Sequence, residues 1–135
     1  MRYLLDASAL LNLIKTFGEK VPNVVKDSSI MDLTIYEVGN GVWRLVYLLK
    51  EINYDEGLKL LKAVAGLCSQ LNVTGLDETL FKVYDVAFQE GLTFYDACYI
   101  ISAKKTALAL VTDDIQLASK AKKYVSVLSS KSFSA

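Results

Sequence analysis

Carboxylate side chains recur at four separated points of the chain, each at the end of an apolar run or on a helix that such a run introduces. The acidic residues are Asp6, Glu37, Asp96 and the adjacent pair Asp113 and Asp114. In open α/β sheets, ligands bind in the crevice at the carboxyl ends of the strands. Carboxylates gathered there would repel one another by about 3 kcal/mol per pair at roughly 5 Å and an effective dielectric constant of about 20, and a divalent cation would relieve that repulsion.

The residue types that are missing narrow the chemistry further. The chain has no histidine, and its two cysteines, Cys68 and Cys98, lack a Cys-x-x-Cys spacing. Ser-His-Asp and Cys-His nucleophiles and His-rich zinc sites are therefore excluded, and we expect buried free thiols. Oxygen ligands suit Mg²⁺ or Mn²⁺ better than zinc or copper. The sequence predicts a metal-dependent enzyme that uses carboxylate chemistry.

Asp6 and Glu37 also have structural interpretations. Asp6 has the spacing to Ala9 of a cap for the following helix. A metal ligand and a cap are equally open interpretations of Asp6. Glu37 has the spacing of the second half of a capping box with Thr34, and for Glu37 by itself the capping role is somewhat favoured. On a helix, Glu37 would share a face with Asn40, so that a carboxylate and an amide would project together.

Asp96 and the adjacent pair Asp113 and Asp114 also have structural interpretations. Asp96 lies in the first turn of a helix that Thr93 is placed to cap, where the helix dipole favours a negative charge by roughly 0.3–1 kcal/mol. Thr112, Asp113 and Asp114 follow an apolar run, and a turn from strand to helix commonly ends in Asp or Thr as the cap. The convergence of all four segments at one edge of a sheet favours a site over four unrelated caps.

The elements that must position these residues alternate between strand and helix. Apolar runs predict strands at 2–5, 29–33, 72–76, 108–111 and 124–128. Helical spacing predicts helices at 8–13, 21–26, 34–51, 55–70, 78–89, 93–103 and 115–122. This alternation favours a mainly parallel sheet covered on both faces, a three-layer α/β/α architecture. For helix 78–89 we expect an inward face that carries Leu80, Phe81, Tyr84, Ala87 and Phe88.

Composition limits the class of protein. The 135 residues fit one domain, 1–135, and equal numbers of acidic and basic residues give a formal net charge of +0. Any contact with a polyanion must therefore be local. Hydrophobic residues make up 53% of the chain, but no apolar stretch approaches the roughly 20 residues that span a bilayer. The N-terminus lacks the features of a signal peptide, so we expect a soluble, cytoplasmic protein without membrane contact.

At this point the sequence resembles PIN-domain nucleases, in particular the VapC-like toxins of prokaryotic toxin–antitoxin pairs. The resemblance spans nearly the whole chain and rests on four stretches: residues 5–9 (LDASA), 36–40 (YEVGN), 93–99 (TFYDACY) and 110–114 (LVTDD). It implies a PIN-like α/β/α fold and a Mg²⁺- or Mn²⁺-dependent endoribonuclease. It also implies a homodimer that is held inactive by a small antitoxin encoded beside it.

The resemblance also assigns roles to residues. It implies Asp6, Glu37 and Asp96 as metal ligands, with Asp114 as the acidic residue of the family's Thr-x-Asp turn. Asp113 occupies the variable position of that turn, so the sequence leaves open which of the two aspartates reaches the metal. Three polar residues match positions that support the acidic site in the family: Ser8, Asn40 and Thr112.

Contacts with RNA and with partner proteins are expected at other positions. Arg44 lies two helical turns beyond Glu37, where it would bind substrate or contact the antitoxin. A basic rim is a weaker expectation, since solvated helix faces explain most of its lysines: Lys104, Lys105, Lys120, Lys122 and Lys123. Excess apolar surface on helix 55–70 and at Trp43 and Tyr47 makes that region the candidate for partner contact.

Two rival functions use the same residues. In aspartyl-phosphate chemistry Asp6 would attack a phosphoryl group, but the dehalogenase-like pattern wants a second aspartate two residues later, where this chain has Ser8. Glu37 on a helix also has no place in a receiver domain. The non-enzymatic rival is a PIN-like domain kept as a binding or regulatory module, and the complete acidic set argues against it.

Overall fold

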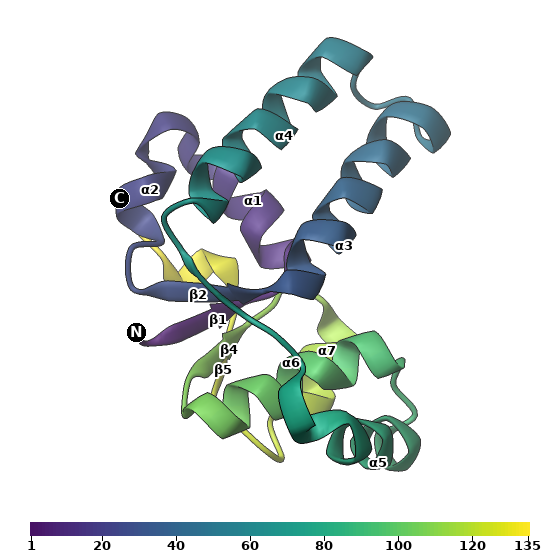
Figure 1. Ribbon diagram of the computed structural model, residues 1–135. Coiled ribbons are helices and arrows are strands. Elements are labelled where there is room, and N and C mark those ends of the chain that lie inside the picture. The colour runs from purple at the N-terminus through teal and green to yellow at the C-terminus, as the bar shows by residue number, and fades with distance from the viewer.

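The computed structural model describes residues 1–135, and its centre is a sheet of five strands (Figure 1). The strand order is β3 (Asn72–Thr74), β2 (Ser28–Met31), β1 (Tyr3–Leu5), β4 (Ala109–Val111) and β5 (Val127–Leu128). Every neighbouring pair is parallel. All five predicted strands are present, each shorter than predicted, and the expectation of a mainly parallel sheet is confirmed.

Helices cover both faces of the sheet, as Figure 1 shows. One layer contains α1 (Ala7–Phe17), α2 (Val21–Val24), α3 (Asp32–Trp43) and α4 (Tyr54–Cys68), and the other contains α5 (Leu80–Glu90), α6 (Phe94–Thr106) and α7 (Ile115–Ala121). Alternation along the strands supplies both cores: Leu4 and Leu110 pack with α5–α7, whereas Leu5 and Val111 pack with α1–α4. The predicted three-layer α/β/α fold is confirmed. No helix combines the length and the apolar character that crossing a membrane would require.

Helix α3 begins two residues earlier than the sequence predicts. Thr34 was expected to cap it, but the cap is Met31, and the Thr34 hydroxyl reaches back to accept the Met31 N–H at 3.0 Å. The helix passes at Arg44 into a π-helical segment, η2 (Arg44–Leu48), and therefore ends before Glu51. As a consequence, Glu37 lies beyond the first turn, and its interpretation as part of a capping box with Thr34 is wrong.

The inward face predicted for α5 is also wrong, apart from Ala87. The buried positions are Val83, Val86, Ala87 and Glu90, whereas Phe81 is 78% and Phe88 80% exposed. Both faces of this helix carry apolar side chains, and the smaller ones pack against α6, where they allow a close approach of the two helices. The sequence analysis had predicted that the opposite face of α5 would be buried.

The strand order places a topological switch between β1 and β4. From β1 the chain moves outward to β2 and β3, and it then returns to add β4 and β5 on the other side. Leu5 pairs with Val111, and the Asp6 N–H donates to the Val111 carbonyl at 3.0 Å. This register brings Asp6 and Thr112 side by side at the point where parallel α/β sheets open a crevice.

Candidate active site

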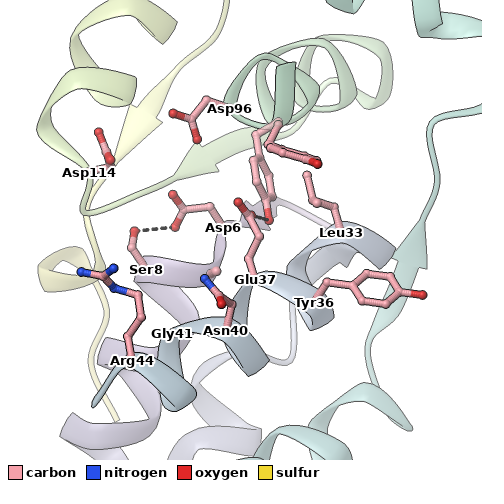
Figure 2. Close-up of a pocket in the computed structure, with 13 residues that line it drawn as sticks. Asp6, Ser8, Leu33, Tyr36, Glu37, Asn40, Gly41, Arg44, Asp96 and Asp114 are labelled. Carbon is pink, nitrogen blue, oxygen red and sulfur yellow. Dashed lines mark hydrogen bonds between the residues drawn. The ribbon is translucent and has the colours of Figure 1, made fainter. Parts of the chain in front are cut away.

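A cleft of about 900 Å³ opens at this switch point and gathers acidic residues from four segments of the chain (Figure 2). Asp6 follows β1, Glu37 lies on α3, Asp96 lies in the first turn of α6, and Asp114 precedes α7. Ser8, Asn40 and Arg44 also line the cleft. The structure thus brings together all the predicted site residues except Thr112, which lies behind Asp6, and Asp113.

Asp6 is buried, and donors from the chain satisfy both of its carboxylate oxygens. Its Oδ1 accepts the Ala9 N–H at 2.9 Å and the Ser8 hydroxyl at 2.7 Å, and its Oδ2 accepts the Thr112 hydroxyl. The predicted cap on α1 is therefore real. It does not compete with a place in the cleft, because the same side chain does both.

The two hydroxyls that hold Asp6 are themselves held by backbone amides. The Asp113 N–H donates to Ser8 Oγ at 3.0 Å, and the Asp114 N–H donates to Thr112 Oγ1 at 3.1 Å. Since each hydroxyl accepts one of these amides, its own proton is directed at Asp6. Two parallel donor chains therefore run from the turn after β4 to the two oxygens of Asp6, and they explain why Ser8 and Thr112 are hydroxyl residues.

Glu37 has one firm partner, the hydroxyl of Tyr99 on α6. Tyr99 Oη donates to Glu37 Oε1 at 2.7 Å and lies 2.9 Å from Thr34 Oγ1. Tyr99 belongs to one of the stretches that carry the family resemblance, but sequence analysis assigned it no role, because a tyrosine in an apolar helix is usually a core residue. Its spacing of three residues from Asp96 is the signal that places it on the helical face nearest the site.

Asp96 and Asp114 lie at helix starts, where the backbone presents unpaired N–H groups. Thr93 caps α6 by accepting the Asp96 N–H at 3.1 Å, as predicted, and a hydrogen bond with the Thr93 side chain lowers the pKa of the Asp96 carboxyl against the larger effect of burial. Asp114 caps α7 through Oδ1, which accepts the Leu117 N–H at 2.8 Å. Asp114 Oδ2 has no such partner, and its side chain lines the cleft.

The carboxylate of Asp113 does not line the cleft. Its Oδ2 accepts Asn12 Nδ2 at 2.7 Å and its Oδ1 accepts the Ser130 N–H at 2.8 Å, so its carboxylate ties the C-terminal segment to α1. It lines a neighbouring hollow together with Lys15 and Lys131. Burial would raise the pKa of Asp113, but the hydrogen bonds from Ser130 and Asn12 outweigh burial and lower it.

The electrostatics of the cleft are those of crowded, partly desolvated anions. Burial raises the pKa of Asp6, and the hydrogen bonds from Thr112, Ala9 and Ser8 oppose that rise. Burial also raises the pKa of Glu37, opposed by Tyr99 and reinforced by the charges of Asp96 and Asp6. For Asp96, burial and then the charges of Asp114 and Asp6 raise the pKa. Burial is thus the largest cause of the raised pKa in Asp6, Glu37 and Asp96, and neighbouring acidic charges add to it.

Cations of the chain do little to offset this charge. None of the four carboxylates forms an ion pair with a lysine or arginine. Arg44 lines the cleft, but it lies beyond ion-pair distance of every carboxylate there. The five lysines suggested for a basic rim do not line the cleft, and two of them bind other acids: Lys105 pairs with Asp77 and Glu78, and Lys123 pairs with Glu90.

The donor set fits a hard divalent cation. It consists of carboxylate oxygens with the Asn40 amide nearby and contains no sulfur or imidazole, as Mg²⁺ and Mn²⁺ prefer. As placed, no three acidic side chains converge closely enough to enclose one ion. This spacing agrees with the usual behaviour of Mg²⁺, which keeps several waters and takes only one or two carboxylates directly.

Known proteins are similar to this chain in sequence and in fold, although no family model matches it. It is 37% identical over 127 residues to the exonuclease VapC9 of Pyrobaculum aerophilum, covering 94% of this chain and 91% of the relative. It is 32% identical over 127 residues to the ribonuclease VapC3 of the same organism, covering 89% of this chain and 95% of the relative.

Solved structures are also similar to this chain in fold. The crystal structure of PAE2754 from Pyrobaculum aerophilum superposes with a TM-score of 0.80 and 34% identity, over 98% of this chain and 92% of that one. A toxin–antitoxin complex from Klebsiella pneumoniae contains a chain that shares the fold, with a TM-score of 0.58 and 15% identity over 83% of this chain and 86% of that one.

Proposed function

The chain belongs to the VapC family of PIN-domain nucleases, and from that relationship we propose that it is a Mg²⁺- or Mn²⁺-dependent endoribonuclease, the toxin of a toxin–antitoxin pair. One observation supports this proposal above all. Four carboxylates from four segments line one cleft at the switch point of the sheet, and no cation of the chain pairs with them. Such an arrangement costs stability unless a divalent cation is its normal occupant.

In this proposal Asp6, Glu37, Asp96 and Asp114 hold the cation. A bound divalent ion would hold the scissile phosphate, lower the pKa of a bound water and neutralise charge on the leaving oxygen. Asp6 and Glu37 are fixed by their donors, so they define where phosphate chemistry takes place. Ser8 and Thr112 orient Asp6, and the Asn40 amide adds a polar group beside Glu37.

Arg44 is the residue we assign to substrate binding. It lines the cleft from the first residue of η2, directly after α3, on the same helical face as Asn40 and Glu37, and its guanidinium is free of ion pairs. A guanidinium in that position suits a phosphate of the RNA backbone, which it would bind through two parallel N–H donors. Replacement by Ala should raise KM for RNA more than it lowers kcat.

The test is cleavage of a circular, single-stranded RNA by the purified protein in Mg²⁺ or Mn²⁺. A circle has no ends, so only an endonuclease opens it, whereas a linear RNA of the same sequence is also a substrate for an exonuclease. We expect the circle to be cut, and we expect both EDTA and Asp6→Asn to abolish cutting.

The other outcomes are equally informative. Cleavage of the linear RNA alone would contradict endonuclease action and favour the exonuclease activity that the name of VapC9 states for that relative. A folded protein that cuts neither RNA and binds no Mn²⁺ in calorimetry would overturn the enzymatic proposal and favour a binding module.

For self-association we propose the exposed face of α5. This face carries Phe81 and Phe88, seven residues apart, with Tyr84 and Asp85 midway between them. In an antiparallel contact across a two-fold axis, Phe81 of each copy meets Phe88 of the other, so the face is complementary to itself. Two phenylalanines that are each more than three-quarters exposed require such a cover in water.

For the antitoxin we propose the end of α3 with η2 and α4, the region where the sequence predicted contact with a partner or a second subunit. Trp43 and Tyr47 stack there with ring centroids 5.4 Å apart, and both are exposed. On α4, Leu58 and Leu61 are also partly exposed, while Val64 and Leu67 turn into the core. This surface lies on the opposite layer from α5, so both partners can bind at once.

Two double variants separate these assignments. Phe81→Ser with Phe88→Ser should give a monomer in light scattering that still co-purifies with the small protein encoded beside it. Trp43→Ser with Tyr47→Ser should give the reverse, a dimer that no longer retains that protein. A dimer in the first variant would overturn the assignment of α5.

A further inference from the structure

A buried tyrosine connects Glu37 to the start of its own helix. Tyr99 is 1% exposed, and it is the largest side chain among those that are fully buried. Its hydroxyl lies 2.7 Å from Glu37 Oε1 and 2.9 Å from Thr34 Oγ1. Thr34 Oγ1 in turn accepts the Met31 N–H at 3.0 Å. Three hydrogen bonds therefore run in series from the end of β2 to the acidic cleft.

The direction of this series follows from counting protons. An ionised carboxylate only accepts, so the single proton of the Tyr99 hydroxyl is directed at Glu37. Tyr99 Oη must then accept from Thr34, whose hydroxyl accepts the Met31 amide on its other side. Every proton in the chain points toward Glu37, and hydrogen bonds aligned in this way polarise and strengthen one another.

This series of hydrogen bonds also joins the two helical layers. Tyr99 lies on α6, in the core on one face of the sheet, while Thr34 and Glu37 lie on α3, which packs mainly on the other face. The bond from Tyr99 to Glu37 thus crosses over the edge of the sheet, above the carboxyl ends of the strands. It sets the distance between a carboxylate on one layer and the Asp96 helix on the other.

We propose that Tyr99 is a positioning residue of the active site, which anchors Glu37 Oε1 and thereby presents the other carboxylate oxygen, Oε2, to a divalent cation in the cleft. This inference rests on the proposed metal-dependent function. The hydroxyls of Ser8 and Thr112 orient the Asp6 carboxylate in the same way. Glu37 stands on a longer side chain with one more rotatable bond, and it has a single donor, so its position depends on Tyr99 more than that of Asp6 depends on either hydroxyl.

A purely structural role for Tyr99 makes a different prediction. The ring alone would fill the core, and phenylalanine would fill it as well. A buried tyrosine hydroxyl that merely needs a partner would contribute to stability and nothing else. The two roles are separated by a measurement on the folded protein that reports on Glu37 rather than on packing.

The chain supplies a matched control for that measurement. Tyr124 Oη donates to Glu90 Oε2 at 2.6 Å, a second tyrosine–glutamate hydrogen bond outside the cleft. Tyr99→Phe and Tyr124→Phe each remove one hydroxyl and keep the ring. Both variants of the full chain are compared with the wild type for thermal unfolding, Mn²⁺ binding by calorimetry without RNA, and kcat and KM for RNA.

We expect Tyr99→Phe to weaken Mn²⁺ binding by about 10–100-fold, the usual effect of removing a group that orients a metal ligand. It should also lower kcat with little change in KM, whereas Tyr124→Phe should bind Mn²⁺ as the wild type does. A second pair acts one step upstream: Thr34→Val should weaken binding in the same direction, and Thr34→Ser, which keeps the hydroxyl, should restore it.

Two results would overturn the inference, and they are distinguishable. If Tyr99→Phe unfolds earlier but binds Mn²⁺ with unchanged affinity, Tyr99 is only a core residue and the proposed nuclease function stands. If the wild type itself binds no Mn²⁺ while it remains folded, the metal-dependent function fails together with the role of Tyr99.

Discussion

The acidic cleft has two sides that are built differently. On one side, Asp6 and Glu37 are held by hydroxyl groups whose protons all point at them. On the other side, Asp96 and Asp114 stand at the starts of α6 and α7, and their donors, Thr93 and Leu117, belong to the start of the same helix. Asp6 and Glu37 are therefore fixed to another segment of the chain, whereas Asp96 and Asp114 are adjustable together with the start of their own helix.

The difference follows from where each residue lies. Asp6 is buried and Glu37 half-buried against the core, so the chain must supply donors or leave desolvated anions. Asp114 is exposed, whereas Asp96 is half-buried like Glu37, and the positive ends of α6 and α7 favour a negative charge on both residues. A site assembled in this way combines a fixed reference point with groups that can follow a substrate.

The largest effect is expected for Asp114, the adjustable residue next to the fixed pair. Asp114→Asn keeps the cap on α7, because Asn caps helices as well as Asp does, but it removes the charge. Because orienting groups alone contribute about 10–100-fold, loss of a ligand charge should reduce kcat/KM by more than about 100-fold. The measurement is RNA cleavage at saturating Mg²⁺.

The adjacent aspartate is the control for that result. Asp113→Asn should keep nearly wild-type cleavage and lose a small amount of stability, because Asp113 binds Asn12 and the Ser130 amide outside the cleft. The reverse outcome, an inactive Asp113 variant and an active Asp114 variant, would reassign the acidic residue of the turn.

An intermediate effect is expected on the fixed side, at Thr112. Thr112→Val preserves shape but removes the donor to Asp6 Oδ2 and the acceptor of the Asp114 amide. We expect a loss of about 10–100-fold in kcat and of about 1.5–3 kcal/mol in the free energy of unfolding, measured in denaturant. Thr112→Ser retains the hydroxyl and should restore both values. Full activity in the valine variant would show that Asp6 does not need its second donor.

Much of this site could be predicted because it depends on local pattern. Asp6 and Thr112 each follow an apolar strand, and parallel pairing of those strands brings their ends together whatever the rest of the chain does. The caps by Asp6 and Thr93 likewise depend on a spacing of three residues. These features needed only the sequence and the general rules of parallel sheets.

Other features depend on how distant elements cross, which no local pattern reports. The role of Tyr99 exists only because α6 passes α3 at the sheet edge, so its sequence context indicated an ordinary core residue. The choice between Asp113 and Asp114 depends on the direction of one turn. On α5, Phe81 and Phe88 were expected to face inward, whereas the packing with α6 buries Val83 and Val86 instead.

The smallest effect that we expect is on the free energy of unfolding, through the charge of Asp96 on the adjustable side. The pKa of Asp96 is raised from its ordinary value of 3.8 by burial and by the charges of Asp114 and Asp6. A carboxyl group with a raised pKa in the folded state binds its proton more tightly there than in the unfolded chain. The ionised form therefore destabilises the fold at neutral pH, and this cost disappears as the pH falls through the raised pKa.

Asp96→Asn removes the charge and keeps a side-chain oxygen that can accept the hydrogen bond from Thr93. At pH 7, without metal, we expect the variant to be more stable than the wild type by up to about 1 kcal/mol, the upper range for partly exposed charges. The advantage should shrink as the pH falls through the raised pKa toward 3.8, because the wild-type group is protonated in both states only below that value. Denaturant unfolding between pH 4 and pH 7 measures it, with Asp27→Asn, at an exposed aspartate outside the cleft, as the control that should change little. A variant less stable than the wild type at pH 7 would mean that Asp96 is held by favourable contacts, and the contrast between a fixed and an adjustable side would fail.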